Sequence, residues 1–261
     1  TPVLMSIATN TPASCVGGPN NGALTTNTSG GTAPYTYIWS NGAMSADISA
    51  VGSGTYTVTV TDANMSQATA TATVIFLPVT NTNSGLSYAT IQAAIDAGST
   101  VNGNIIQVCA GTYPEQIIVN KELDIRGPNY GIDGNGSRLV GEAIIVPPSE
   151  LNLGAPREWN TNPLITFSVN NIKMDGFKIS GDNPSINGYV YAGMNVEAGR
   201  GVKSTGNDIT FKNNIVEKFT YIGFHAEGGL PTPTYTNLIV NRNKFDNIHD
   251  LNQLGYGFAM Y

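Results

Sequence analysis

Charged side chains are scarce in this sequence of 261 residues. Only 11% of the residues are Asp, Glu, Lys or Arg, against roughly 25% in a typical soluble domain. The net charge is −6, and the chain lacks the clustered cations that neutralise nucleic-acid phosphates. We therefore expect no nucleic-acid partner.

Long apolar segments and a signal peptide are also absent. A membrane-spanning helix needs about 20 consecutive apolar residues, and no run approaches that length, so we expect no membrane insertion. Without a signal peptide the chain reads as a mature or excised piece. Thr, Ser, Asn and 30 glycines replace the missing charges. This composition favours long β structures whose surfaces are covered by hydroxyl and amide groups rather than by charges.

Residue types that carry chemistry are few. The chain has two histidines and two cysteines, and it contains no metal-ligand cluster, nucleotide-binding loop or nucleophile elbow. We expect no metal and no cofactor. Because Cys15 and Cys109 lie on opposite sides of a predicted domain boundary, we expect both to be free, buried thiols.

The boundary follows from the uneven distribution of charge. Residues 1–80 contain Asp47 and Asp62 and no Lys or Arg, so the remainder carries all 12 basic and 16 of the 18 acidic residues. We expect a first domain at 1–78, a linker at 79–86 and a second domain at 87–261.

The first domain consists of short alternating segments separated by Gly, Pro and Asn. Residues 35–39, 55–61 and 67–75 have the alternation and β-branched content of strands, and strands at this spacing predict a β-sandwich. Trp39 and Tyr56 are the expected core residues. Because the stretch has no His and no basic residue, we expect a spacer or binding module.

Two segments carry a family resemblance, namely GGTAPYTYIWSNG at 30–42 and GTYTVTVTDAN at 54–64. They closely resemble the SprB-type repeat of gliding-motility surface adhesins, an Ig-like module that occurs in tandem in very large bacterial surface proteins. The resemblance implies an Ig-like fold over residues 1–78. The family usually has Gly-Cys after Asp-Ala-Asn, where this chain has Met65 and Ser66, so Cys15 lacks the partner that the family implies.

The second domain contains a repeat. Apolar residues at positions i, i+2 and i+7 recur at similar intervals along the chain, and a second apolar pair recurs at intervals of nearly the same length. The shared period, roughly 30 residues, predicts a solenoid whose repeating unit is made of strands. The first frame is Ile172/Met174/Ile179, Ile209/Phe211/Val216 and Leu238/Val240/Phe245; the second is Ile165/Phe167, Met194/Val196, Ile222/Phe224 and Tyr256/Phe258.

Position i+5 of the first frame holds Phe177, Asn214 and Asn243. Asparagines stacked at a bend bind neighbouring backbone groups along the solenoid axis, so we expect such a ladder here. Ahead of the repeat, Ser87 is expected to cap a helix over 88–97 that ends at Gly98. A helix this short needs an apolar surface to pack on, and the open end of the solenoid provides one.

The segment from Tyr88 to Ile95 and the turn Gly111-x-Tyr113-x-Glu115 resemble the entrance of pectin-lyase-like proteins. The resemblance implies a right-handed parallel β-helix with a short N-terminal capping helix. Pectin methylesterases share this turn, but their catalytic motifs are absent here, so we interpret Glu115 as structural.

The repeat frame also predicts which side chains point outward. Lys173, Thr210 and Ile239 form one outward column, Asp175, Lys212 and Asn241 a second, and Lys178, Ile215 and Lys244 a third. One interpretation is a shallow carbohydrate-binding face in which cations neutralise sugar acids; the alternative is an ordinary solvated face. The carbohydrate-binding candidates are Lys173, Asp175, Lys178, Lys212 and Lys244.

The second frame places Glu197 beside His225 on adjacent strands, which makes them the best general acid–base candidates. A glycosidase needs two carboxyl groups about 5–10 Å apart, and Glu227 is the available second acid. Nothing else in the sequence specifies catalysis at these residues.

We therefore predict an all-β protein, an Ig-like β-sandwich followed by a parallel β-helix, in a secreted or surface-attached structural or adhesive protein. The partners that this function implies are surface glycans or neighbouring subunits. One alternative is a polysaccharide lyase or glycoside hydrolase with an Ig-like accessory module. Another is a self-assembling surface-layer or fibre subunit.

Overall fold

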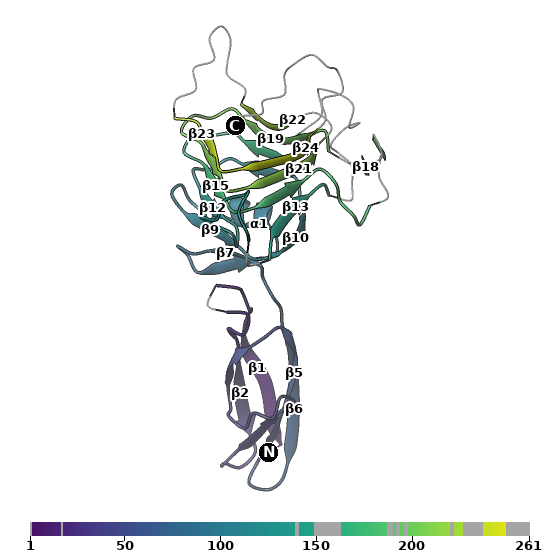
Figure 1. The fold of residues 1–261 in the computed structure, drawn as a ribbon. Coiled ribbons are helices and arrows are strands. Elements are labelled where there is room, and N and C mark those ends of the chain that lie inside the picture. Colours follow the sequence, from purple (N-terminus) through teal and green to yellow (C-terminus); the bar gives the residue numbers. More distant parts are fainter. Residues whose placement is uncertain are drawn as a thin grey trace. The chain divides into compact units, whose positions relative to one another are not determined.

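The computed structural model describes residues 2–16, 18–138, 141–148, 163–186, 190–191, 194–195, 198–219, 222–226 and 237–248. This part of the chain is nearly all β, with several sheets and a single short helix. The chain divides into two compact units, Thr1–Pro78 and Val79–Tyr261 (Figure 1).

The first unit contains two antiparallel sheets of three strands each. One sheet has the order β1 (Val3–Thr11), β2 (Gly22–Gly30), β4 (Ile48–Val51). The other has the order β3 (Thr36–Trp39), β5 (Gly54–Thr61), β6 (Gln67–Val74).

Both sheets contribute to one apolar cluster. Leu24 and Ile48 come from the first sheet, and Trp39, Val58 and Val74 come from the second. The alternation along β5 and β6 places Val and Ala on the inner side and Thr on the outer side, as a half-buried sheet requires. Trp39 is fully buried as expected, whereas Tyr56 packs on the cluster while only partly buried.

A buried carboxylate holds the turn after β5. Asp62 accepts hydrogen bonds from the backbone N–H groups of Thr32, Asn64 and Ser66 at 3.0, 2.9 and 2.8 Å. Burial raises the pKa of Asp62, but the three N–H groups outweigh that effect and leave the pKa below its ordinary value.

The expectation of free thiols is wrong. Both cysteines lie in described segments, and both Cys15 and Cys109 are disulfide-bonded. A disulfide depends on the separation of the Cα atoms and the direction of the Cβ atoms, which neither sequence spacing nor a missing family cysteine reveals.

In the second unit, successive strands along the chain belong to three different sheets (Figure 1). From β9 to β16 and again from β19 to β24, the strands follow one repeating order. A strand of the seven-stranded sheet is followed by one of the five-stranded sheet and then by one of the four-stranded sheet. The seven-stranded sheet has the order β23 (Ile239–Asn241), β20 (Thr210–Lys212), β15 (Lys173–Asp175), β12 (Asp124–Arg126), β9 (Ile105–Val108), β7 (Val79–Asn81), β8 (Leu86–Tyr88).

The other two sheets are parallel throughout. The five-stranded sheet has the order β10 (Gly111–Pro114), β13 (Ala143–Val146), β16 (Lys178–Ser180), β21 (Ile215–Phe219), β24 (Lys244–Ile248). The four-stranded sheet has the order β11 (Ile117–Val119), β14 (Ile165–Phe167), β19 (Arg200–Ser204), β22 (Ile222–Ala226). A separate antiparallel pair consists of β17 (Val190–Tyr191) and β18 (Met194–Asn195).

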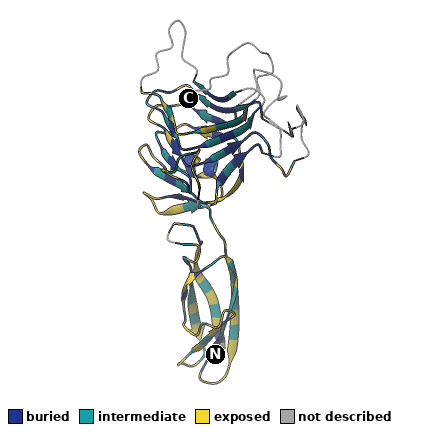
Figure 2. Ribbon diagram, viewed as in Figure 1, coloured by how far each residue is buried: buried dark blue, intermediate teal, exposed yellow. Residues whose placement is uncertain are grey.

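The first repeat frame is confirmed by the strand register. Met174 pairs with Phe211, and Phe211 pairs with Val240, as the frame predicts. Met174 and Phe211 are buried in a core to which all three sheets contribute, and Val240 packs against it. Figure 2 shows the buried positions as dark blue stretches along the strands of this unit.

The predicted asparagine ladder is present at the corner between the seven-stranded and five-stranded sheets. The Asn214 Oδ1 atom accepts a hydrogen bond from the Phe177 N–H at 2.9 Å, and its Nδ2 donates to the Met174 carbonyl at 3.2 Å. One coil further along, Asn243 accepts from the Asn214 N–H and donates to the Phe211 carbonyl, both at 2.9 Å. The side chains thereby satisfy backbone groups that the bend removes from the ladder of the sheet.

The second repeat frame is wrong. Ile165 pairs with Val202 rather than with Met194, and Val202 pairs with Phe224. Met194 belongs instead to the separate antiparallel pair, and Val196, Tyr256 and Phe258 lie outside the described residues.

Two expectations at the start of this unit are also corrected. The expected linker at 79–86 contains β7, which is buried and pairs with β9, and the start of β8. The helix α1 spans Ile91–Asp96, and its N-cap is Thr90, whose hydroxyl accepts from the Ala93 N–H. Pairing with β7 holds residues 86–88 in an extended strand, so the helix starts later than predicted.

Side chains from the residues just before and just after β11 bind both ends of α1. The carboxylate of Glu115 accepts from the N–H groups of Ile91 and Gln92 at 3.0 and 2.9 Å. At the other end, Lys121 Nζ donates to the carbonyls of Ile95 and Ala97 at 2.6 and 3.0 Å. An anion at the first turn and a cation at the last complement the helix dipole.

The helix also closes the edge of the four-stranded sheet. The side-chain amide of Gln92 accepts from the Ile118 N–H at 2.7 Å and donates to the Ile118 carbonyl at 3.3 Å, which replaces the neighbouring strand that β11 lacks on this side. The apolar face of α1 (Ile91, Ala94 and Ile95) is buried in the core. An unpaired strand edge is a template for aggregation, and α1 covers this one.

Candidate functional site

Three of the carbohydrate-binding candidates lie on the outer side of the seven-stranded sheet. Lys173 pairs with Thr210, and Asp175 pairs with Lys212. The predicted outward columns on this sheet are therefore in register, and the next strand extends them by Ile239 and Asn241.

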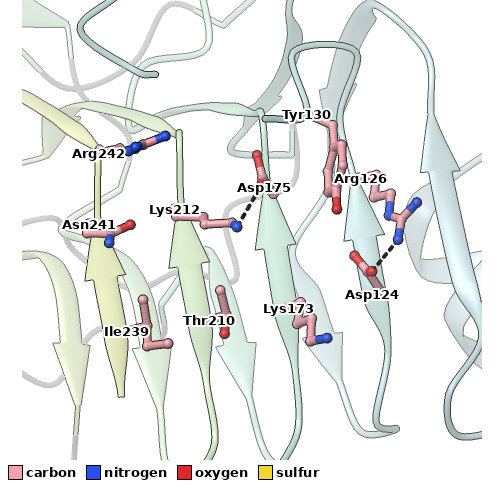
Figure 3. A pocket seen from close by; sticks show the side chains of 10 residues that line it. All are labelled: Asp124, Arg126, Tyr130, Lys173, Asp175, Thr210, Lys212, Ile239, Asn241 and Arg242. Atoms are coloured by element: carbon pink, nitrogen blue, oxygen red, sulfur yellow. Dashed lines mark hydrogen bonds and ion pairs between the residues drawn. The ribbon is translucent and has the colours of Figure 1, made fainter. Parts of the chain in front are cut away.

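The columns line a groove of about 600 Å³ (Figure 3). Figure 3 shows the side chains in two rows across the strands, with Tyr130 near one end and Arg242 near the other. The lining residues are Asp124, Arg126, Tyr130, Lys173, Asp175, Thr210, Lys212, Ile239, Asn241 and Arg242.

Asp175 differs from the surface ion-pair partner that the sequence predicts. It is only 2% exposed, and both of its carboxylate oxygens accept from Asn213 Nδ2 at 2.9 and 3.0 Å. Its Oδ1 atom also accepts from the Gly131 N–H at 2.9 Å. The ion pair with Lys212 exists, but at 3.8 Å between Nζ and Oδ2. Asp175 therefore serves mainly as an internal acceptor that fastens a loop to the sheet.

That loop, residues 127–138 and here called the corner loop, follows β12. It contacts the bends that follow the later strands β20 and β23 of the same sheet. The Gly134 N–H donates to the Arg242 carbonyl at 2.9 Å, and the guanidinium of Arg138 donates to the Asn213 carbonyl. The loop lies so close to Gly176, whose φ is +84°, that a Cβ there would fall 2.3 Å from the Tyr130 nitrogen. The loop is thereby held against the sheet, and it positions Tyr130.

Tyr130, Arg126 and Asp124 form a stacked group at one end of the groove. The Arg126 guanidinium carbon lies 4.5 Å from the centre of the Tyr130 ring, and Arg126 Nη2 donates to Asp124 Oδ2 at 2.6 Å. The hydrogen bond with Asp124 raises the pKa of Arg126. Two atoms of this group, Asp124 Oδ1 and Arg126 Nε, are inaccessible to solvent and have no hydrogen-bond partner in the described structure.

The cations of the groove outnumber its carboxylates. Arg126, Lys173, Lys212 and Arg242 line it together with Asp124 and Asp175, and the adjoining hollow that shares Lys173 adds Glu122 and Asp208. Within the described residues, Lys173 and Arg242 form no ion pair. The groove is thus a locally cationic strip on a chain whose net charge is −6.

The two remaining carbohydrate-binding candidates lie on a different sheet. Lys178 and Lys244 flank Ile215 on the five-stranded sheet. Lys178 forms an ion pair with Glu217 at 3.0 Å, and Lys244 forms one with Asp246 at 3.3 Å. The five candidates therefore form two separate surfaces, and the first surface lines the groove.

Of the acid–base candidates, His225 lies in the described structure. It stands on β22, where the strand register pairs it with Lys203 of β19. Glu197 and Glu227 lie outside the described residues. In the described part of the chain, no group of three or more His, Cys, Asp or Glu residues is placed to hold a metal ion.

Four groove residues were not singled out from the sequence: Asp124, Arg126, Tyr130 and Arg242. For the first two a signal exists, because Leu123-Asp124-Ile125-Arg126 has the same apolar–polar alternation as the repeat frame. The register joins Ile125 to Met174, which is a much longer step along the chain than the period of the later coils. The extra length includes the corner loop, which conceals the repeat.

Comparison with known proteins supports the resemblance seen in the first unit. Residues 7–44 match the model of the SprB repeat family. A "Cell surface glycoprotein" of Methanothermus fervidus is 33% identical over 121 residues, which is 44% of this chain and 19% of that protein. Among the described residues, no helix has the length and hydropathy of a membrane span. No solved structure matches, and the chain spans only about a fifth of the curated relative it resembles.

Proposed function

We propose that this chain is part of a structural or adhesive protein of the cell surface. The observation that carries the proposal is the match of residues 7–44 to the SprB repeat. The similarity to a cell surface glycoprotein supports the same location independently, because it covers more residues than the repeat does.

In this proposal the first unit is an Ig-like spacer and the second is a right-handed parallel β-helix that acts as a stalk or glycan-contacting surface. The two antiparallel sheets around one core support the first assignment. The rotation of strands through three sheets and the asparagine ladder support the second. The candidate contacts to glycans are Lys173, Asp175, Lys178, Lys212 and Lys244.

Surface location is tested by brief protease treatment of intact cells that express the full-length protein. We expect peptides from residues 1–261 in the supernatant, in at least tenfold excess over peptides of a cytosolic marker, because a surface domain is accessible without lysis. If the peptides appear only after the cells are lysed, the proposal is wrong.

We also expect no cleavage of uronic-acid polymers such as pectin or alginate. The expectation follows from the sequence, in which nothing beyond Glu197, His225 and Glu227 specifies the acid–base or paired-carboxyl arrangement that glycoside cleavage requires. The assay measures new reducing ends and unsaturated products with the wild type and with Glu197→Gln and His225→Ala. Activity that disappears in both variants would replace the structural proposal with the enzymatic alternative.

A further inference from the structure

We propose that the groove over β12, β15, β20 and β23 binds an anionic polysaccharide whose carboxylate or sulfate groups contact Lys173, Lys212 and Arg242. The inference rests on the proposed surface function and deepens it. It selects one of the two candidate surfaces and adds Arg126, Tyr130 and Arg242 to the contacts.

The charges that face the groove are the first argument. Asp175 is directed to Asn213 and the corner loop, and Asp124 neutralises Arg126 at 2.6 Å. Lys173 and Arg242 have no ion-pair partner in the described structure, and the Nζ of Lys212 is 3.8 Å from its partner oxygen. After these pairings the groove retains positive charge available to a ligand.

The arrangement of the cations favours a polymer over a single anion. Lys173 lies on β15, Lys212 on the adjacent β20, and Arg242 directly after β23, the next strand. Lys173 pairs with Thr210, and Lys212 lies two residues beyond Thr210. Lys212 pairs with Asn241, and Arg242 is the next residue. Neighbours on this diagonal are about 5–8 Å apart at the backbone, so the row suits negative charges repeated along a chain that crosses the strands.

The remaining groups favour a sugar over an acidic peptide. Tyr130 is 46% exposed, and the corner loop fixes its position, so it provides a preformed aromatic surface for the apolar face of a sugar ring. Thr210 and Asn241 also line the groove, and their hydroxyl and amide groups can donate hydrogen bonds to, and accept them from, the hydroxyl groups of a sugar.

The five-stranded sheet provides a matched comparison surface. Lys178 and Lys244 have carboxylate partners on their own sheet, so a ligand must displace an existing ion pair to reach them. Replacing both of them removes the same net charge as replacing Lys173 and Arg242, without altering the groove.

The test measures the dissociation constants of the full chain for alginate, dextran sulfate, neutral dextran and polyglutamate at low ionic strength. We expect binding to alginate or dextran sulfate, and the stronger of the two identifies carboxylate or sulfate as the preferred group. The double variant Lys173→Gln/Arg242→Gln should raise that dissociation constant about tenfold, and Lys178→Gln/Lys244→Gln less than about twofold. Tyr130→Phe should retain the binding that Tyr130→Ala weakens.

Three results would overturn the inference. Equal losses in the two double variants would mean that only net charge matters. Binding of dextran or polyglutamate as tight as that of the anionic polysaccharides would contradict an anionic sugar ligand. Absence of binding to both anionic polysaccharides would remove the site, but it would leave the surface location, which protease treatment of cells tests separately.

Discussion

Replacing Asn214 with Ala should lower the free energy of unfolding of the second unit by about 3 kcal/mol. Asn214 is fully buried, and its side chain satisfies the Phe177 N–H and the Met174 carbonyl. The variant leaves both backbone groups without a partner and out of reach of water, at about 1–3 kcal/mol each. Pulse-labelling hydrogen exchange across a guanidinium series measures the loss, and peptides of the first unit serve as the internal reference.

Asn243→Ala is the matched control for this prediction. Asn243 makes the same two contacts one coil further along, but it is only half-buried, so water can replace part of what its side chain provides. We expect a loss of about 1 kcal/mol. Equal losses at the two positions would show that burial does not determine the strength of the ladder.

The asparagine ladder was predictable because a short bend joins two strands and fixes the number of residues between their apolar positions. From Ile172 to Ile179, from Ile209 to Val216 and from Leu238 to Phe245, two strands are joined by a short bend, so apolar positions recur with the same internal spacing. The asparagines stand in that bend at a constant place. The spacing within such a unit is dictated by strand geometry, and the sequence therefore reports it reliably.

The second repeat frame failed because the other connections have no such constraint. The register joins Ile165 to Val202 and Val202 to Phe224, and the second of these steps along the chain is much shorter than the first. Loops outside the coil change length at little energetic cost. The assumption of a regular period therefore selected Met194 as the neighbour of Ile165, and the pairing of Glu197 with His225 was predicted from that same register; Glu197 lies outside the described residues.

The same reasoning explains what was missed in the groove. Lys173 and Lys212 belong to units joined by the tight corner and were placed correctly, and the contact of Lys212 with Asp175 follows from the register. Tyr130 reaches the groove through the corner loop, whose path depends on contacts with Gly176 and Arg242 that are distant in the chain. Local periodicity does not contain such contacts.

The burial of Asp175 could not be predicted from the apolar–polar alternation either. Alternation assigns its side chain to the outer side of the sheet, which is correct, but the corner loop then covers that place. Burial depends on what packs over a side chain as well as on the side of the sheet that it occupies.

The second large effect is expected at Glu115, where Ala should lower the free energy of unfolding of the second unit by about 2 kcal/mol. The carboxylate binds the N–H groups of Ile91 and Gln92, and both lose their partner in the variant. Gln92 also closes the edge of β11, so the loss at the helix extends to the four-stranded sheet. Glu115→Gln keeps one acceptor oxygen, and we expect about half of the loss.

The control for Glu115 is Glu122→Ala, which makes the same chemical change at a half-buried glutamate whose side chain has no hydrogen bond or ion pair among the described residues. We expect a change within about 0.5 kcal/mol. A loss at Glu122 as large as the loss at Glu115 would contradict a specific role at the helix.

The pH dependence of stability reports the balance between burial and helix capping at Glu115. Burial raises the pKa of Glu115, and the two backbone N–H groups lower it by less, so the pKa in the folded protein lies above the ordinary value of 4.5. The folded state therefore binds more protons than the unfolded state just above that value, and this group's contribution to stability falls as the pH rises through that window. Glu115→Gln cannot titrate, so the difference in unfolding free energy between wild type and Glu115→Gln should shrink over the same window and then stay constant. A difference that does not change with pH would mean that the two N–H groups cancel the effect of burial on this pKa.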